Sequence, residues 1–144
     1  MIIFNVLHLL GAVFIIGPMA ILPMLGLGAL RTGNHAMVLR IAASLRVLNY
    51  LSLLVAVFGF GLMGTSSPEY KLSVTTPWIL TSIILYLVAF LVTTFVVLPT
   101  LFTAGRAVTA AGEEKPAGYP ALAASSGITA LLLVAVVVLM VWKP

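Results

Sequence analysis

The stretch VLHLLGAVFIIGPMAILPMLGLGAL, residues 6–30, decides the fold of this chain. It holds no Asp, Glu, Lys or Arg, and about 20 apolar helical residues are enough to cross the hydrocarbon core of a bilayer. The stretch therefore predicts a transmembrane helix over residues 3–30, long enough to cross with some tilt. Pro18 and Pro23 each remove a backbone hydrogen bond, which predicts that this helix is bent near the middle of the membrane.

The composition of the whole chain agrees with a membrane protein. Of 144 residues, 62% are hydrophobic and 7% are charged, and the mean hydropathy is +1.27; soluble domains lie far from these values. The net charge of +4 comes from residues scattered between apolar runs, which favours topology signals over a nucleic-acid surface. The absence of cysteine excludes disulfides, thiolate metal sites and cysteine nucleophiles.

Three more apolar stretches follow, and they predict helices over 40–63, 78–102 and 121–142. Polar connections separate them, and the connections are short enough for neighbouring helices to run antiparallel. We therefore expect an all-α protein. It would form a single domain over residues 1–144, an integral membrane four-helix bundle with an up-and-down topology and partners that include the lipid bilayer.

The distribution of basic residues predicts the orientation of the bundle. Five of the seven Lys and Arg residues fall in or beside the 31–40 and 103–120 connections: Arg31, Arg40, Arg46, Arg106 and Lys115. The positive-inside rule then places both connections in the cytoplasm and both termini outside the bacterial inner membrane. Trp78 and Trp142 would lie together at the outer interface, where aromatic residues are enriched.

His8 is the main candidate for a functional group, because ionisable residues within membrane spans are rare and usually functional. Helical spacing puts Asn5, His8 and Gly11 on one stripe, which should face the other helices. One interpretation is structural: a neutral imidazole hydrogen-bonded to Tyr86 or to a hydroxyl such as that of Ser82. The small residues Gly11 and Gly26 would allow close helix packing.

A cofactor role for His8 is the other interpretation. Copper(I) suits imidazole together with thioethers, and Met1, Met63 and Met140 are expected near the outer helix ends. Haem would need a mixed or intermolecular ligand set, because His35 lies in the opposite connection, roughly 30 Å away. A quinone bound by His8 and Tyr86 is a third possibility. The residues alone do not decide among copper, haem and quinone.

Elsewhere the chain offers little chemistry. Arg46, Asn49 and Tyr50 form a smaller polar cluster at the cytoplasmic end. We expect it to bind the hydroxyls of Thr93 and Thr94 or a lipid phosphate. No phosphate loop, membrane carboxylate or Ser–His–Asp set is present in the sequence. We therefore expect a protein without catalytic activity of its own, acting as an accessory or scaffold subunit that associates with itself or with a larger membrane complex. The alternative is a copper- or haem-handling protein that uses His8 near the outer surface.

Four short motifs resemble domain of unknown function 2269, a family of predicted bacterial integral membrane proteins. They are LHLLGA at 7–12, LP at 98–99, GY at 118–119 and LMVWKP at 139–144. This resemblance implies a bundle of membrane helices and brings no settled activity with it. More distantly, the early histidine resembles that of the copper resistance D-type membrane proteins and the flavin-free membrane protoporphyrinogen oxidases. That likeness implies a metal- or haem-facing role for His8.

Overall fold

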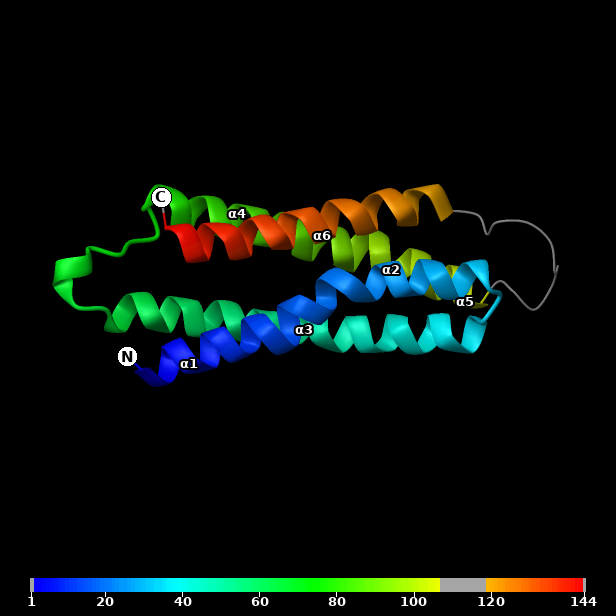
Figure 1. The fold of residues 1–144 in the computed structure, drawn as a ribbon, viewed down its shortest axis with the longest axis horizontal. Helices are drawn as coiled ribbons and strands as arrows, with labels where there is room; N and C mark the ends of the chain where they lie inside the picture. The colour runs from blue at the N-terminus through cyan, green and yellow to red at the C-terminus, as the bar shows by residue number, and fades with distance from the viewer. Residues whose placement is uncertain (1, 107–118, 144) are drawn as a thin grey trace.

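The computed structural model of this protein describes residues 2–106 and 119–143. Within these ranges the chain contains four long helical segments and no strand, and each segment is long and apolar enough to cross a membrane. They run antiparallel, and the free ends of the first and last segments lie at the same end of the molecule (Figure 1). The expected all-α membrane bundle of four helices is confirmed.

Each segment is built from one or more helical elements. The first contains α1 (Ile2–Gly11), the π-helix η1 (Ala12–Ile16) and α2 (Gly17–Arg31). The second is α3 (His35–Thr65), and the connection that follows holds a 3₁₀ turn, η2 (Pro68–Tyr70). The third contains α4 (Pro77–Val92), the π-helix η3 (Thr93–Val97) and α5 (Leu98–Arg106), and the fourth is α6 (Tyr119–Trp142).

The second helix begins earlier than its apolar pattern predicts. It starts at His35 and not at residue 40, because the side chain of Asn34 accepts a hydrogen bond from the backbone N–H of Met37 and caps the helix there. A single polar residue is enough to cap a helix, and the cap can precede the apolar stretch by several residues. The apolar pattern alone therefore does not predict where the helix begins. The third segment likewise runs past 102, to Arg106.

Both π-helices end two residues before a proline, at Ile16 before Pro18 and at Val97 before Pro99, and this explains why they form. The ring of a proline clashes with the carbonyl four residues earlier and brings no N–H. The residue before Pro18, Gly17, bonds instead to the carbonyl five residues back, that of Ala12. Leu98, before Pro99, does the same to Thr93. Each turn is widened, and the proline is accommodated without breaking the segment.

The widened turn at Pro18 is also where the first segment bends. Figure 1 shows the direction changing between α1 and α2, and η1 lies between them. Pro23 lies inside α2, which continues as an unbroken α-helix from Gly17 to Arg31. The predicted bend of the first helix is therefore confirmed, and the π turn places it at Pro18.

This bend decides which helices touch. Beyond it, α2 packs on both α3 and α6, whereas before it α1 packs mainly on α3; α4 packs on α6 and α5 on α3. At the end that holds both termini, here called the terminal end, the bundle thus consists of two pairs, α1 with α3 and α4 with α6. At the opposite end, here called the basic end, the segments close together around fully buried residues such as Leu45 and Leu101.

Two glycines make the close contacts of the first segment possible. A Cβ on Gly11 would lie 2.6 Å from Cγ2 of Val55, and one on Gly26 would lie 2.8 Å from Cδ2 of Leu101. Both distances are shorter than real carbon contacts allow. The backbone of the first segment therefore approaches α3 and α5 only because these positions carry no side chain.

Candidate functional site

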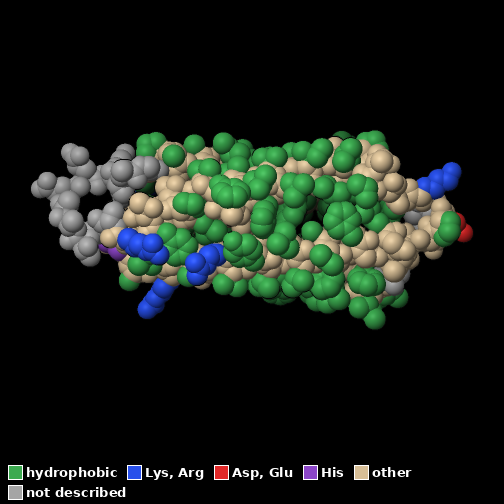
Figure 2. Space-filling model, turned by 180° about the vertical axis from the view of Figure 1, so that it is seen from behind, with side chains coloured by type: hydrophobic (Ala, Val, Ile, Leu, Met, Phe, Trp, Pro, Cys, Tyr) green, Lys and Arg blue, Asp and Glu red, His purple; other side chains and the backbone are tan. Residues whose placement is uncertain are grey.

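A cavity of about 530 Å³ lies at the terminal end, between the two helix pairs. The bend at Pro18 creates it, because α1 follows α3 and leaves α4 and α6 on the other side. Figure 2 shows a hollow in the apolar surface, away from the end where the basic side chains gather. The lining is mostly apolar, and its polar or sulfur-bearing members include Asn5, His8, Ser52, Met63, Tyr86 and Met140.

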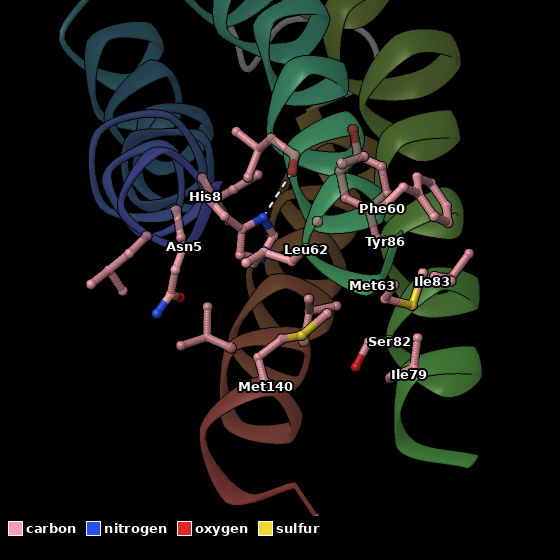
Figure 3. Close-up of a pocket in the computed structure, with 18 of the residues that line it drawn as sticks. Asn5, His8, Phe60, Leu62, Met63, Ile79, Ser82, Ile83, Tyr86 and Met140 are labelled. Carbon is pink, nitrogen blue, oxygen red and sulfur yellow. Dashed lines mark hydrogen bonds between the residues drawn. The ribbon is translucent and has the colours of Figure 1, made fainter. Parts of the chain in front are cut away.

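His8 lies in this cavity with one ring nitrogen already used. Its Nδ1 lies 2.8 Å from the carbonyl oxygen of Val55 on α3, as the dashed line in Figure 3 shows. A carbonyl only accepts, so Nδ1 carries the proton, and in the neutral ring Nε2 is left as an acceptor. The expected partner, Tyr86 or a hydroxyl, is not the one found: the imidazole bonds the backbone of α3.

Gly59 makes room for this ring. A Cβ at Gly59 would lie 3.0 Å from Cε1 of His8 and 3.3 Å from its Nδ1. Because the ring rests on the bare backbone of α3, it comes close enough to bond the carbonyl of Val55, one helical turn before Gly59. The same carbonyl thus fixes the orientation and the tautomer of the imidazole.

The hydroxyl of Tyr86 also has its proton committed. Ser52 Oγ lies 2.5 Å from the carbonyl oxygen of Asn49 and 2.7 Å from the hydroxyl of Tyr86. The serine has one proton, and the carbonyl can only accept it. Tyr86 must therefore donate its own proton to Ser52, and the lone pairs of its oxygen are what it offers to the cavity.

The interior of the cavity is consequently rich in acceptors and poor in donors. Ser82 donates its proton to the carbonyl of Trp78, at 2.7 Å, so it too offers lone pairs. The side chains with free donor groups, Asn5, Trp78 and Lys143, belong to helix ends at the terminal end. A ligand that fits this arrangement carries an electron-poor centre inside and a negative or accepting group near the membrane surface.

The structure places two of the three methionines expected near His8 in the same cavity. Met63 comes from α3 and Met140 from α6, and Figure 3 shows both beside the space that His8 borders. Met1 lies outside the described residues. Within the described part of the chain, no group of three or more His, Cys, Asp or Glu side chains could hold a metal ion.

Arg46 and Asn49 lie apart from the cavity. Asn49 donates from Nδ2 to the hydroxyl of Thr94, at 2.8 Å. The guanidinium of Arg46 stacks on Phe102, 5.3 Å from the ring centre, and that of Arg106 lies 5.4 Å from the same ring. Asn49 thus joins α3 to η3 and Arg46 joins α3 to α5, and neither residue lines the cavity.

Two residues that bond the polar side chains of the cavity were not predicted from the sequence: Ser52 and Val55. A signal for Ser52 exists, because Ser52, Ala56, Gly59 and Met63 follow one another at steps of four, three and four residues. Such spacing marks one face of a helix, and the first three residues of this face are small or polar within a largely apolar helix. The stripe predicts a face of α3 turned toward the bundle interior, although it does not reveal a backbone carbonyl as the partner of His8.

The fold and the cavity define the class of this protein. It is an integral membrane protein of four helices, and the half that holds both termini contains a mostly apolar cavity with a few polar side chains. The chain belongs to the family described as predicted integral membrane protein, DUF2269, which matches residues 2–144. No curated protein matches the chain, and no solved structure does. The family description fixes the membrane setting and leaves the function to be argued from the cavity.

Proposed function

We propose that this protein binds haem in the cavity at the terminal end, where Nε2 of His8 would hold the iron. The observation that carries the proposal is the hydrogen bond from His8 Nδ1 to the carbonyl of Val55 inside an apolar cavity. Histidines that ligate metals almost always donate their other ring N–H to such a group, which fixes the tautomer and raises the basicity of the ligating nitrogen. Bound haem would supply redox or ligand-binding chemistry at its iron.

The direction of the hydrogen bonds favours haem over a quinone. The carbonyl oxygens of a quinone accept hydrogen bonds, but the protons of His8 Nδ1 and Tyr86 are donated within the protein. A metal centre needs lone pairs instead, and Nε2 of His8 provides one. Lys143, at the terminal end of the same cavity, supplies a cation for acidic side groups of a porphyrin.

The size of the cavity favours haem over a bare copper ion. A volume of about 530 Å³ lies within the range of roughly 300–1,000 Å³ that drug-sized organic ligands occupy. A metal ion alone, held about 2.0–2.3 Å from its ligands as zinc is, would fill a small part of it. Copper(I) is the second candidate because Met63 and Met140 supply thioethers in the cavity of His8.

The accessory or scaffold role expected from the sequence stays a prediction. It drew on small residues that allow helices to approach, and Gly11, Gly26 and Gly59 meet residues of this chain. A Cβ on Gly28 or on Gly64 would meet nothing within 4 Å, so these two positions are free to meet a second copy or a larger complex. The expected sidedness, with the cavity in the outer half of the bacterial inner membrane, is part of the same proposal.

Titration with hemin in mild detergent tests the proposal. Purified wild-type protein should develop a Soret band that saturates near one haem per chain, and His8→Ala should weaken binding by roughly 100-fold or more, since loss of a supporting group alone costs about 10–100-fold. His35→Ala is the matched control, because His35 begins α3 at the basic end and should bind as the wild type does.

Copper content and quinol binding are measured on the same preparations. Stoichiometric copper that disappears in His8→Ala, without a Soret band, would replace haem by the second candidate. Equal haem spectra for wild type and His8→Ala would overturn His8 as the ligand. A wild-type protein that takes up neither haem nor copper would return the accessory role to first place.

A further inference from the structure

Four buried polar atoms in the middle of the bundle have no hydrogen-bond partner within the part of the chain that the structure describes. They are Asn49 Oδ1, Thr93 Oγ1, Ser126 Oγ and Thr129 Oγ1. None of the four residues exposes more than 1% of its surface. An unpaired polar group in such a place costs about 1–3 kcal/mol, so four together require an explanation.

The four residues lie at one level. Asn49 is sixteen residues from the end of α3 at Thr65, Thr93 is sixteen from Pro77, and Ser126 is sixteen from Trp142, with Thr129 one turn nearer that end. At 1.5 Å per residue, the depth from the terminal end is about 20–24 Å for each. The π-helix η3 packs against both α3 and α6, so three helices bring these atoms to the same layer.

The hydroxyls in this layer differ from others in the chain. Serine and threonine in helices commonly donate to the carbonyl one turn back, as Thr81, Thr94 and Thr100 do here. Thr93, Ser126 and Thr129 make no such bond. In addition, Pro99 has no N–H and Leu98 bonds the carbonyl of Thr93, so the carbonyl of Thr94 loses its usual donor and adds an acceptor to the layer.

We propose that this layer holds ordered water, bound by Asn49 Oδ1 and by the hydroxyls of Thr93, Ser126 and Thr129. Water both donates and accepts, so it satisfies an amide oxygen and three hydroxyls at once, and buried waters typically make about three such bonds. No charged side chain belongs to the set, which favours water over a strongly hydrated cation. The inference does not depend on haem binding.

A series of polar groups connects the water layer to the cavity, through Asn49 itself and two hydrogen bonds. Asn49 carries Oδ1 in the layer, its carbonyl accepts from Ser52 at 2.5 Å, and Ser52 accepts from Tyr86 at 2.7 Å. Tyr86 and Ser52 border the cavity. A polar path thus leads from the middle of the membrane to the candidate ligand site, through an otherwise apolar bundle.

Valine and alanine substitutions test for water by the sign of the stability change. If water fills the layer, Thr93→Val, Thr129→Val or Ser126→Ala removes one of its partners, and Tm should fall by roughly 2–5 °C. If the layer is dry, each substitution removes an unpaired polar atom and Tm should rise. Thr100→Val is the control, because its hydroxyl bonds the carbonyl of Val96, at 2.6 Å, outside the layer.

Hydroxyl-radical footprinting of the wild-type protein gives a second readout that needs no variant. Radicals form from bound water, so Val97, fully buried in η3, should be oxidised several-fold faster than Val38, which is equally buried at the basic end. Equal protection of the two valines, or a rise in Tm for the layer variants, would overturn the proposal. Loss of haem binding in His8→Ala would leave both readouts unchanged.

Discussion

The ring of His8 and the carbonyl of Val55 are joined at 2.8 Å across the contact between α1 and α3, 47 positions apart in the chain. This bond is one of the few side-chain ties that α1 makes to the rest of the bundle. Interhelical hydrogen bonds in membranes contribute on average about 0.6 kcal/mol and at most about 1.7. We expect His8→Ala to lower the free energy of unfolding by about 1 kcal/mol in detergent, measured by SDS titration; a change below 0.2 kcal/mol would show that the bond does not hold α1.

Gly59 should be intolerant of any side chain, whereas Gly64 should accept one. A Cβ at Gly59 meets the ring of His8 at 3.0 Å, and a Cβ at Gly64 meets nothing within 4 Å. Gly59→Val should displace the imidazole and cost about 1–3 kcal/mol, as overpacking does, and it should weaken hemin binding as well. Gly64→Val should change stability by less than about 0.5 kcal/mol. Equal behaviour of the two variants in thermal melts and hemin titrations would contradict the contact.

The fold could be predicted because its causes are local and repeated. Apolar runs such as residues 6–30 set the number of crossings, and Pro18 set the bend, since both act through the chain's own backbone. The exact turn at which the first segment bends, and the π-helix that forms there, were harder to predict. A proline inside a helix can also be accommodated by a kink, so whether the turn before it widens into a π turn depends in addition on what α1 meets on α3.

The candidate site was predictable only in part for the same reason. His8 stood out as an ionisable residue in a membrane span, but its partner is a backbone carbonyl, that of Val55, and every residue has one. The direction of the Tyr86 hydrogen bond depends on Ser52, which donates its own proton to the carbonyl of Asn49. Nothing in the sequence around Ser52 reveals that it meets Tyr86 on α4. The sequence shows which side chains can form hydrogen bonds, but it does not show which backbone groups are their partners.

Replacing Pro18 should move His8 out of the cavity, whereas replacing Pro23 should leave His8 in place. Pro18→Ala supplies an N–H that can close an ordinary α turn, and removing the extra residue of η1 turns α1 by about 100° relative to α2. His8 would then leave the cavity. In the absence of native cysteines, Phe4→Cys with Gly61→Cys should form a disulfide on oxidation, because a Cβ on Gly61 lies 2.9 Å from the Phe4 ring.

The crosslink reports the rotation of α1 directly. Its yield should fall strongly when Pro18→Ala is added and stay unchanged with Pro23→Ala, because Pro23 lies inside unbroken α2. Full crosslinking in the Pro18→Ala background would mean that packing, and not the proline, maintains the π turn.

The contact of Gly11 with Val55 predicts a similar contrast along the first segment. Gly11→Leu would place a bulky side chain where even a Cβ lies 2.6 Å from Val55 Cγ2, while Gly28→Leu enters open space. We expect the first to lower Tm in detergent by roughly 5–10 °C, through overpacking of about 1–3 kcal/mol, and the second to leave Tm unchanged within about 2 °C. A destabilised Gly28→Leu protein, with Gly11→Leu unaffected, would show that the opposite face of the segment is the packed one.

The sidedness of the bundle can be measured with single cysteines, since any introduced thiol is the only one among the residues of this chain. Thr32→Cys lies beside Arg31 in the connection at the basic end, and Ser67→Cys lies in the connection at the terminal end. The excess of Arg at the basic end opposes its transfer across the membrane. A maleimide that cannot cross membranes should therefore label Ser67→Cys in spheroplasts of intact cells and label Thr32→Cys only after the membrane is opened. The reverse pattern would place the cavity of His8 in the inner half of the membrane, facing haem and copper supplied from the cytoplasm.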